Sequence, residues 1–177
     1  SGLTAITLRS VETTGDMARE LTQRLTALGR AHDLVRPLPG EEGKAALLGD
    51  LLSVLLAPYD DLGAFAGRIR VSVPRMGVGE QAATTLALVV HELATNSLKY
   101  GALSTETGTL DVSCSAHDVE LVIAWTEQGG PPVVTPANSD GYGSKMIARA
   151  VARQLGGSIE RDWSPQGLVV RIRMNKD

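Results

Sequence analysis

The chain has 177 residues, 43% of them apolar, and its formal net charge is −3. This length predicts one or two small domains with enough apolar side chains to form a core. The acidic balance excludes a protein that binds nucleic-acid phosphates along a basic face, and an aromatic content of 3% excludes base-stacking platforms.

The only cysteine, Cys114, excludes a disulfide framework and a cysteine-based metal site, and we expect it to be a small strand residue. No apolar run approaches the roughly 20 residues that span a bilayer, and no signal peptide is visible. We therefore expect a cytoplasmic chain, or a cytoplasmic part of a longer one, with no nucleic-acid partner and no membrane contact.

The first 37 residues are expected to form a helical hairpin. Helices are predicted over 3–13 and 16–35, and the second has Asp16 as a good N-cap and leucines at helical spacing. The short junction favours antiparallel packing. Because two helices cannot bury two apolar stripes between them, we expect docking to another copy, giving a homodimer, or to another domain. Pro37, Pro39 and Gly40 then break the chain, which divides it into domains 1–37 and 38–177.

The second domain is predicted to contain both helices and strands. Leucines at positions 47, 48, 51, 52, 55 and 56 form the buried side of a first helix. The expected elements are helices over 45–57, 79–100 and 143–155, strands over 68–73, 108–115, 119–126, 158–163 and 167–174, and a loop over 128–141. Short turns between most strands predict a mixed, mostly antiparallel sheet with helices on one face, an α+β fold.

The helix over 79–100 carries the most informative pattern of the chain. Spacings of three and four residues place polar side chains on one face: His91, Glu92, Thr95, Asn96 and Lys99. The opposite face has Ala83, Leu86, Val90, Leu93, Ala94 and Ser97. A nucleotide and a metal would suit the polar face, because an Asn oxygen can bind Mg²⁺ and a Lys ammonium can approach phosphate. An amphipathic helix with a solvated face is the alternative.

Two later segments share this unusual chemistry. Trp125–Pro132 (WTEQGGPP) ends a strand, and the carboxylate of Glu127 there can accept a hydrogen bond from an adenine amine. Gly141–Ile147 (GYGSKMI) opens a helix, and a glycine-rich helix start suits phosphate. The alternatives are a surface turn and an ordinary glycine-rich loop, with Trp125 in the core. Neither a P-loop nor a dinucleotide fingerprint occurs.

Together, these three segments resemble the HWE family of sensor histidine kinases. The family is named for a histidine in its first motif and a Trp-x-Glu in its second, here His91, Trp125 and Glu127. Further stretches are similar to the same family: RLTALGRAHDL at 24–34, LAPY at 56–59, QLGG at 154–157 and DWSPQGL at 162–168. The resemblance covers nearly the whole chain and implies a Bergerat-type ATP-binding domain, an α/β sandwich, behind the helical hairpin.

The resemblance also implies roles for individual residues. Asn96 would hold Mg²⁺, Glu92 would orient the metal's water, and Lys99, with His91 and Tyr100, would face the phosphates of ATP. On the base side, Glu127 stands where relatives outside the family have an adenine-reading aspartate, Gly129 keeps the pocket open, and Gly130 belongs to the ATP-binding set. Gly141, Gly143 and Ser144 would line the phosphate side.

The family's phosphoacceptor histidine is not found in this chain. In relatives it opens the first hairpin helix, whereas no histidine precedes His32 here. Truncation and native absence both remain open explanations. His32 matches a histidine of the second hairpin helix, for which we expect a hydrogen-bonded role at the hairpin end rather than phosphorylation.

The implied function is that of a two-component sensor kinase core. Such a kinase transfers the γ-phosphoryl of Mg-ATP to a histidine and then to an aspartate on a response-regulator receiver domain. One alternative is a histidine phosphotransferase or pseudokinase that binds nucleotide without turnover. Another is an anti-sigma-type Ser/Thr kinase, against which the N-terminal hairpin argues.

Overall fold

The structure is a computed structural model that describes residues 15, 18–19, 21–23, 25–26, 28–33, 46–60, 67–132 and 142–175. The expected helix over 3–13, the domain boundary near 37–40, and Gly141 lie outside the described residues. Within the described part of the chain, no helix is both long and apolar enough to cross a membrane.

Five of the described strands form one sheet in the order β2-β4-β5-β7-β6. Their bounds are Ile69–Ser72 (β2), Thr109–Ala116 (β4), Glu120–Gln128 (β5), Ser158–Ser164 (β6) and Gly167–Asn175 (β7). β2 pairs with β4 in parallel and every other neighbouring pair is antiparallel. The predicted mixed, mostly antiparallel sheet is confirmed.

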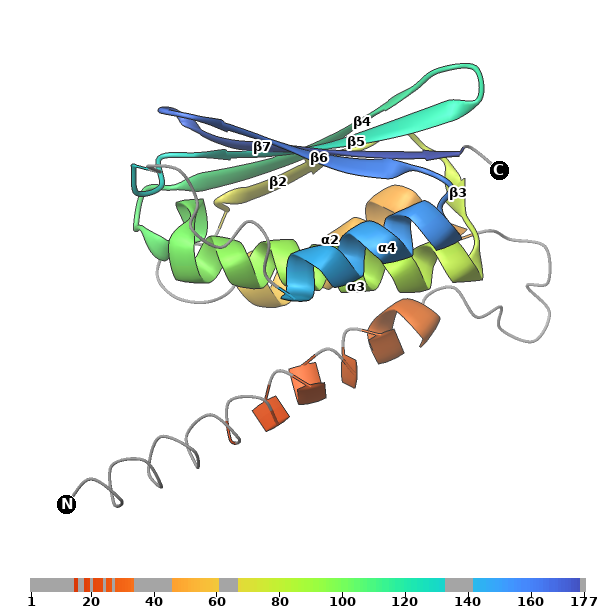
Figure 1. Ribbon diagram of the computed structural model, residues 1–177, viewed down its shortest axis with the longest axis horizontal. Helices are drawn as coiled ribbons and strands as arrows, with labels where there is room; N and C mark the ends of the chain where they lie inside the picture. The colour runs from red at the N-terminus through yellow and green to blue at the C-terminus, as the bar shows by residue number, and fades with distance from the viewer. Residues whose placement is uncertain are drawn as a thin grey trace.

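The helices α2 (Leu48–Asp60), α3 (Glu80–Tyr100) and α4 (Tyr142–Gln154) form a layer on one side of this sheet (Figure 1). α3 packs against both α2 and α4, and a short 3₁₀ helix, η1 (Ala102–Ser104), follows it. The core lies between the two layers, where leucines of α2 and α3 meet the inward side chains of β4, β5 and β7. The predicted α+β sandwich is therefore observed.

The beginning of α2 differs from the prediction. The helix starts at Leu48 rather than near residue 45, because Ala46–Leu47 (β1) pairs antiparallel with Gly77–Val78 (β3). The backbone N–H of Leu48 then donates to the carbonyl of Met76 at 2.9 Å. A ladder of two residues is too short to leave a periodic signal in the sequence.

A single carboxylate connects the end of α2 to the start of β2. Asp60 Oδ1 accepts hydrogen bonds from the backbone N–H groups of Gly67, Arg68 and Ile69 at 3.1, 3.1 and 3.2 Å. The side chain of one helical residue thus fixes where the first strand of the main sheet begins.

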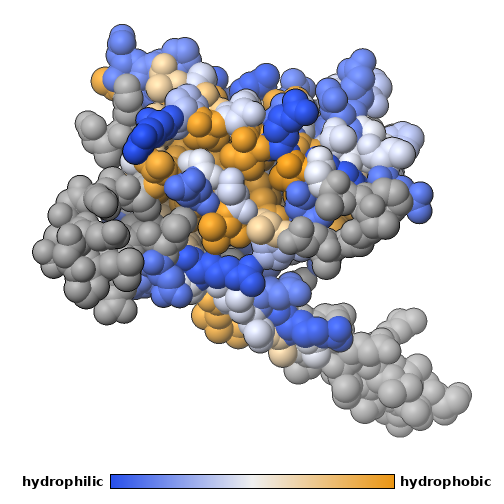
Figure 2. All heavy atoms as spheres, turned by 180° about the vertical axis from the view of Figure 1, so that it is seen from behind, coloured by the Kyte–Doolittle hydropathy of each residue, from blue (hydrophilic) through white to orange (hydrophobic). Residues whose placement is uncertain are grey.

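The described residues before residue 34 are helical and meet the helix layer near their C-terminal end. Ala31 is fully buried there and Leu28 packs against the core, whereas Leu21 and Leu25 are mostly exposed. In Figure 2, apolar atoms lie on the side of this segment that faces away from the rest of the protein.

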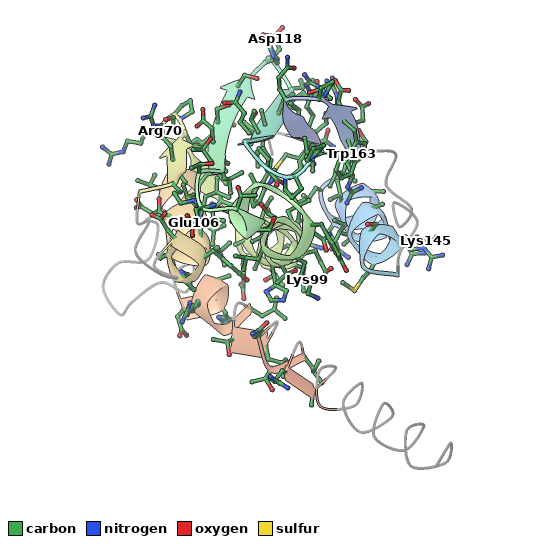
Figure 3. The ribbon with its side chains drawn as sticks, turned by 90° about the vertical axis from the view of Figure 1, so that its left-hand side faces the viewer. Arg70, Lys99, Glu106, Asp118, Lys145 and Trp163 are labelled. Atoms are coloured by element: carbon green, nitrogen blue, oxygen red, sulfur yellow. The ribbon has the colours of Figure 1, made fainter. Side chains whose placement is uncertain are left out.

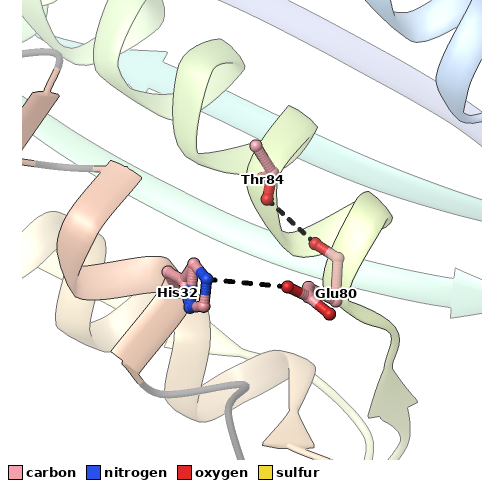
Figure 4. A network of polar contacts seen from close by, with 3 residues as sticks. All are labelled: His32, Glu80 and Thr84. Carbon is pink, nitrogen blue, oxygen red and sulfur yellow. Dashed lines mark hydrogen bonds and ion pairs between the residues drawn. The ribbon is translucent and has the colours of Figure 1, made fainter.

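His32 lies at the same junction. Its Nε2 is 3.6 Å from Glu80 Oε1 at the start of α3, and both side chains are largely exposed (Figure 4). His32 therefore lies beside the start of a neighbouring helix, and the hydrogen-bonded role expected for it at the hairpin end stays a prediction.

Candidate functional site: the C-terminal half of α3 and the end of β5

The predicted apolar face of α3 is buried along its whole length. Ala83, Leu86, Val90, Leu93, Ala94 and Ser97 all lie inside, turned toward the sheet. On the other face, Asn96 and Lys99 are exposed and Thr95 is half-buried, whereas His91 and Glu92 are only 3% and 8% exposed. The polar face is therefore not uniformly solvated, because His91 and Glu92, near the centre of the helix, are enclosed.

His91 is enclosed because α2 packs beside it. The hydroxyl of Tyr59, in the last turn of α2, lies 2.9 Å from His91 Nδ1. Burial raises the pKa of the Tyr59 hydroxyl above its ordinary value, while the positive charge of Arg30 lowers it and the negative charge of Glu92 raises it. The predicted contact of His91 with phosphates stays a prediction, and the residue joins α2 to α3 in addition.

Glu127 lies at the end of β5 and is only 4% exposed. Its Oε1 accepts hydrogen bonds from Ser97 Oγ at 2.7 Å and from the backbone N–H of Ala102 at 3.0 Å. Its Oε2 accepts one from Trp125 Nε1 at 2.9 Å. The surface-turn alternative for Glu127 is thus wrong, because the carboxylate is buried and connects α3, η1 and β5.

Small residues allow these elements to approach. A Cβ on Gly101 would lie 2.2 Å from Glu127 Oε1, and a Cβ on Gly130 would lie 2.8 Å from the nitrogen of Ala102. Gly129 has a φ of +77°, in the left-handed region that favours glycine. Gly101 therefore lies against the Glu127 carboxylate, while Gly129 and Gly130, the glycines predicted for the base side, lie against Gly108 and Ala102.

The other predicted residues lie on the helix ends. Tyr100 is mostly exposed at the end of α3, while Gly143 and Ser144, the latter half-buried, belong to the first turn of α4. Figure 3 looks onto these helix ends and shows Lys99 on the side of α3 away from the sheet and Lys145 at the outer edge of α4. Lys99 follows Asn96 by three residues and so lies on the same face of α3.

A groove of about 690 Å³ runs between α3 and α4 at the opposite end of these helices. Gln81 donates a hydrogen bond to Gln154 across it. None of the predicted site residues lines this groove, whose residues are Glu80, Gln81, Thr84, Thr85, Leu88, Arg149, Ala150, Arg153 and Gln154. Its α3 residues fall on the same helix face as Glu92, Thr95 and Lys99, further toward the N-terminus.

The donor set on α3 fits a magnesium ion that arrives with a nucleotide. Mg²⁺ of this kind takes one or two oxygen ligands from the protein, several waters, and phosphate oxygens. Asn96 offers an exposed amide oxygen, and Glu92 lies one turn before it. Within the described ranges, no group of three or more His, Cys, Asp or Glu side chains is placed to hold a metal ion.

Two contributors to this site were not assigned by the sequence. Ser97 was placed correctly on the buried face, but its bond to Glu127 depends on how α3 packs against β5. No pattern in the sequence indicated the contact between Tyr59 and His91, which are 32 residues apart. Trp125 and Glu127 are two residues apart and so share a strand face, a signal from which their bond could have been found.

The sequence is similar to known histidine kinases. Residues 1–75 match the family model described as HWE histidine kinase. Blue-light-activated histidine kinase 1 of Erythrobacter litoralis is 35% identical over 177 residues, which is 98% of this chain and 48% of that protein. The chain thus spans about half the length of this curated relative.

Solved structures share the fold. The histidine kinase domain of the Erythrobacter litoralis EL346 blue-light-activated kinase aligns with a TM-score of 0.64 at 20% identity, covering 89% of this chain and 75% of that one. The catalytic domain of histidine kinase ThkA aligns with a TM-score of 0.58 at 14% identity, covering 73% and 94%. The fold observed here is that of histidine kinase catalytic domains.

Proposed function

The chain belongs to the HWE histidine kinase family, and we propose that it is the ATP-binding catalytic core of a two-component sensor kinase. In the proposed site, adenine lies near Glu127, Gly129 and Gly130, and the triphosphate lies between the end of α3 and the start of α4. Binding of ATP agrees with the catalytic-domain fold of the solved relatives.

One hydrogen bond carries this proposal. Ser97 Oγ donates to Glu127 Oε1 at 2.7 Å, and Ser97 is the residue next to Asn96. This bond brings the proposed base-reading carboxylate against the turn of α3 that carries the proposed metal ligand, 31 positions away by residue number, and so supports placing both in one site. One Mg-nucleotide presents a metal ion, phosphates and a base, so residues from separate motifs must lie close together to bind all three.

The remaining side chains supply charge and position. Asn96 would hold Mg²⁺, Glu92 would orient its water, and the Lys99 ammonium would offset phosphate charge. The phosphate side would be completed, as the family resemblance implies, by His91, Tyr100, Gly141, Gly143 and Ser144. When bound, Mg²⁺ would neutralise charge on the phosphate oxygens.

The reaction we propose for the intact protein is transfer of the γ-phosphoryl from ATP to a histidine nitrogen, with release of ADP. A receiver-domain aspartate then takes the phosphoryl from that histidine. The exposed Leu21 and Leu25 on the N-terminal helical segment support docking to a second helix there, and we propose that this forms a homodimer.

Nucleotide titration tests the ATP-binding proposal. Calorimetry with ATP, with and without Mg²⁺, is compared for the wild-type chain, Asn96→Ala and Thr84→Ala. Thr84 is an exposed residue of α3 about three turns before Asn96, so its variant is the matched control.

We expect the wild-type chain and Thr84→Ala to bind Mg-ATP alike. Asn96→Ala should lose the increase in affinity that Mg²⁺ gives, at least about tenfold, because one oxygen ligand is removed. Absence of ATP binding by the wild-type chain would contradict the proposed function, as would full Mg²⁺ dependence in Asn96→Ala.

A further inference from the structure

Trp125 and Glu127 are held together within one strand. They are two residues apart on β5, so both side chains leave the same face of the sheet. The indole Nε1 of Trp125 donates to Glu127 Oε2 at 2.9 Å, and the two side chains are 1% and 4% exposed. A buried indole has no alternative solvent partner for its N–H, so this bond fixes the rotamer of the carboxylate.

The acceptor positions of Glu127 are unequally occupied. Oε1 receives two donors, the hydroxyl of Ser97 and the backbone N–H of Ala102. Among the residues that the structure describes, Oε2 receives one donor, from Trp125. Since a carboxylate oxygen can accept two hydrogen bonds, one acceptor position is left on Oε2.

We propose that Trp125 and Ser97 are positioning residues that hold the Glu127 carboxylate so that Oε2 presents its remaining acceptor position to the exocyclic amine of adenine. This rests on the proposed function, in which Glu127 reads the base. Both partners are donors toward the carboxylate, and both are buried beside it. They fix it before the ligand arrives, so that less ordering is needed on binding.

Base selectivity follows from this arrangement. Adenine offers an amine donor at the position where hypoxanthine has a carbonyl oxygen, which a carboxylate repels. A fixed carboxylate therefore favours ATP over ITP, whereas one that can rotate away loses this discrimination. A purely structural role of Trp125 would change stability and leave the ratio of the two affinities unchanged.

The test compares ATP and ITP binding by calorimetry, with Mg²⁺, for the wild-type chain, Trp125→Phe and Ser97→Ala. Phenylalanine keeps an aromatic ring in the core and removes only the N–H donor. Trp163→Phe is the matched control, because Trp163 is the other tryptophan and is partly exposed on β6. Thermal unfolding of each variant reports whether it is folded.

We expect wild type and Trp163→Phe to prefer ATP. In Trp125→Phe the ATP affinity should fall about tenfold with little change for ITP, so the preference largely disappears. Ser97→Ala should show the same loss to a smaller extent. In the wild-type chain, the indole N–H resonance of Trp125 should shift with ATP more than with ITP.

Each outcome separates the two proposals. If the wild-type chain binds no ATP, the proposed function fails and this inference with it. If it binds ATP without preference over ITP, or if a folded Trp125→Phe keeps the wild-type preference, only the inference is overturned. Should Trp125→Phe unfold, Ser97→Ala and the wild-type indole resonance decide the matter in the same way.

Discussion

The hydroxyl of Tyr59 lies 2.9 Å from Nδ1 of His91, so the last turn of α2 is joined to the middle of α3 by a side-chain contact. His91 is the residue immediately before Glu92, whose charge acts on Tyr59. The histidine that gives the family its first letter therefore has a packing partner on the side of α3 that faces α2. From this contact we predict an effect on the free energy of unfolding rather than on catalysis.

Tyr59→Phe should lower the free energy of unfolding by about 1–2 kcal/mol, because the bond is lost and a buried ring nitrogen loses a partner. Chemical denaturation of the isolated chain measures the change. Tyr100→Phe is the control, since Tyr100 is mostly exposed and should change stability by less than about 0.5 kcal/mol. Equal effects of the two variants would show that the Tyr59–His91 contact contributes nothing.

Gly101→Ala should destabilise the chain by about 1–3 kcal/mol through overpacking. The new Cβ would lie 2.2 Å from Glu127 Oε1 and would displace the carboxylate from Ser97 and Ala102. In Gly49→Ala, the closest contact of the added Cβ is 3.8 Å, to Val73, and the helical position should make it neutral or up to about 1 kcal/mol stabilising. A neutral Gly101→Ala would contradict the packing described around Glu127.

Cys114 should react slowly with thiol reagents. Burial raises the pKa of its thiol to about 11, so the reactive thiolate is scarce near pH 8 and its fraction increases only as the pH approaches 11. A disulfide reagent should modify the folded chain tens-fold or more slowly than the urea-unfolded chain at pH 8. Equal rates in the two states would show that Cys114 is not protected.

The chain of 177 residues should bind ATP without phosphorylating itself. Its three histidines are His32, His91 and His117, none of which matches the family's acceptor. Incubation with γ-labelled ATP, followed by an assay for acid-labile phosphate, measures this directly. Calorimetric binding of ATP by the same preparation is the control, and acid-labile label on the chain would contradict the prediction.

The sequence was most informative where a pattern is local and long. The helix over 79–100 is observed as Glu80–Tyr100, because its apolar residues recur at helical spacing against the sheet. The paired strands expected near 108–115 and 119–126 are observed as β4 and β5, with buried residues alternating along β5 and along the first half of β4. A local periodicity of this kind can be recognised in the sequence without knowledge of any tertiary contact.

Contacts between distant residues could not be read in the same way. The β1–β3 ladder pairs Ala46 with Val78 and Leu47 with Gly77, which are 32 and 30 positions apart, and neither segment has a periodic pattern. Two of the partners of Glu127, Ser97 and Ala102, come from α3 and η1, so its burial depends on how those elements pack. Sequence alone left Glu127 between a surface turn and a base-reading role for that reason.

Asp60 has a consequence for how this protein tolerates change. Its Oδ1 atom accepts hydrogen bonds from the backbone N–H groups of residues 67, 68 and 69. Residues 60 and 67 are therefore held as neighbours independently of the residues between them. The entropy of closing a loop increases only slowly with its length. Evolution and engineering alike can therefore lengthen the chain between these two positions while the strand pairing beyond residue 68 stays in register.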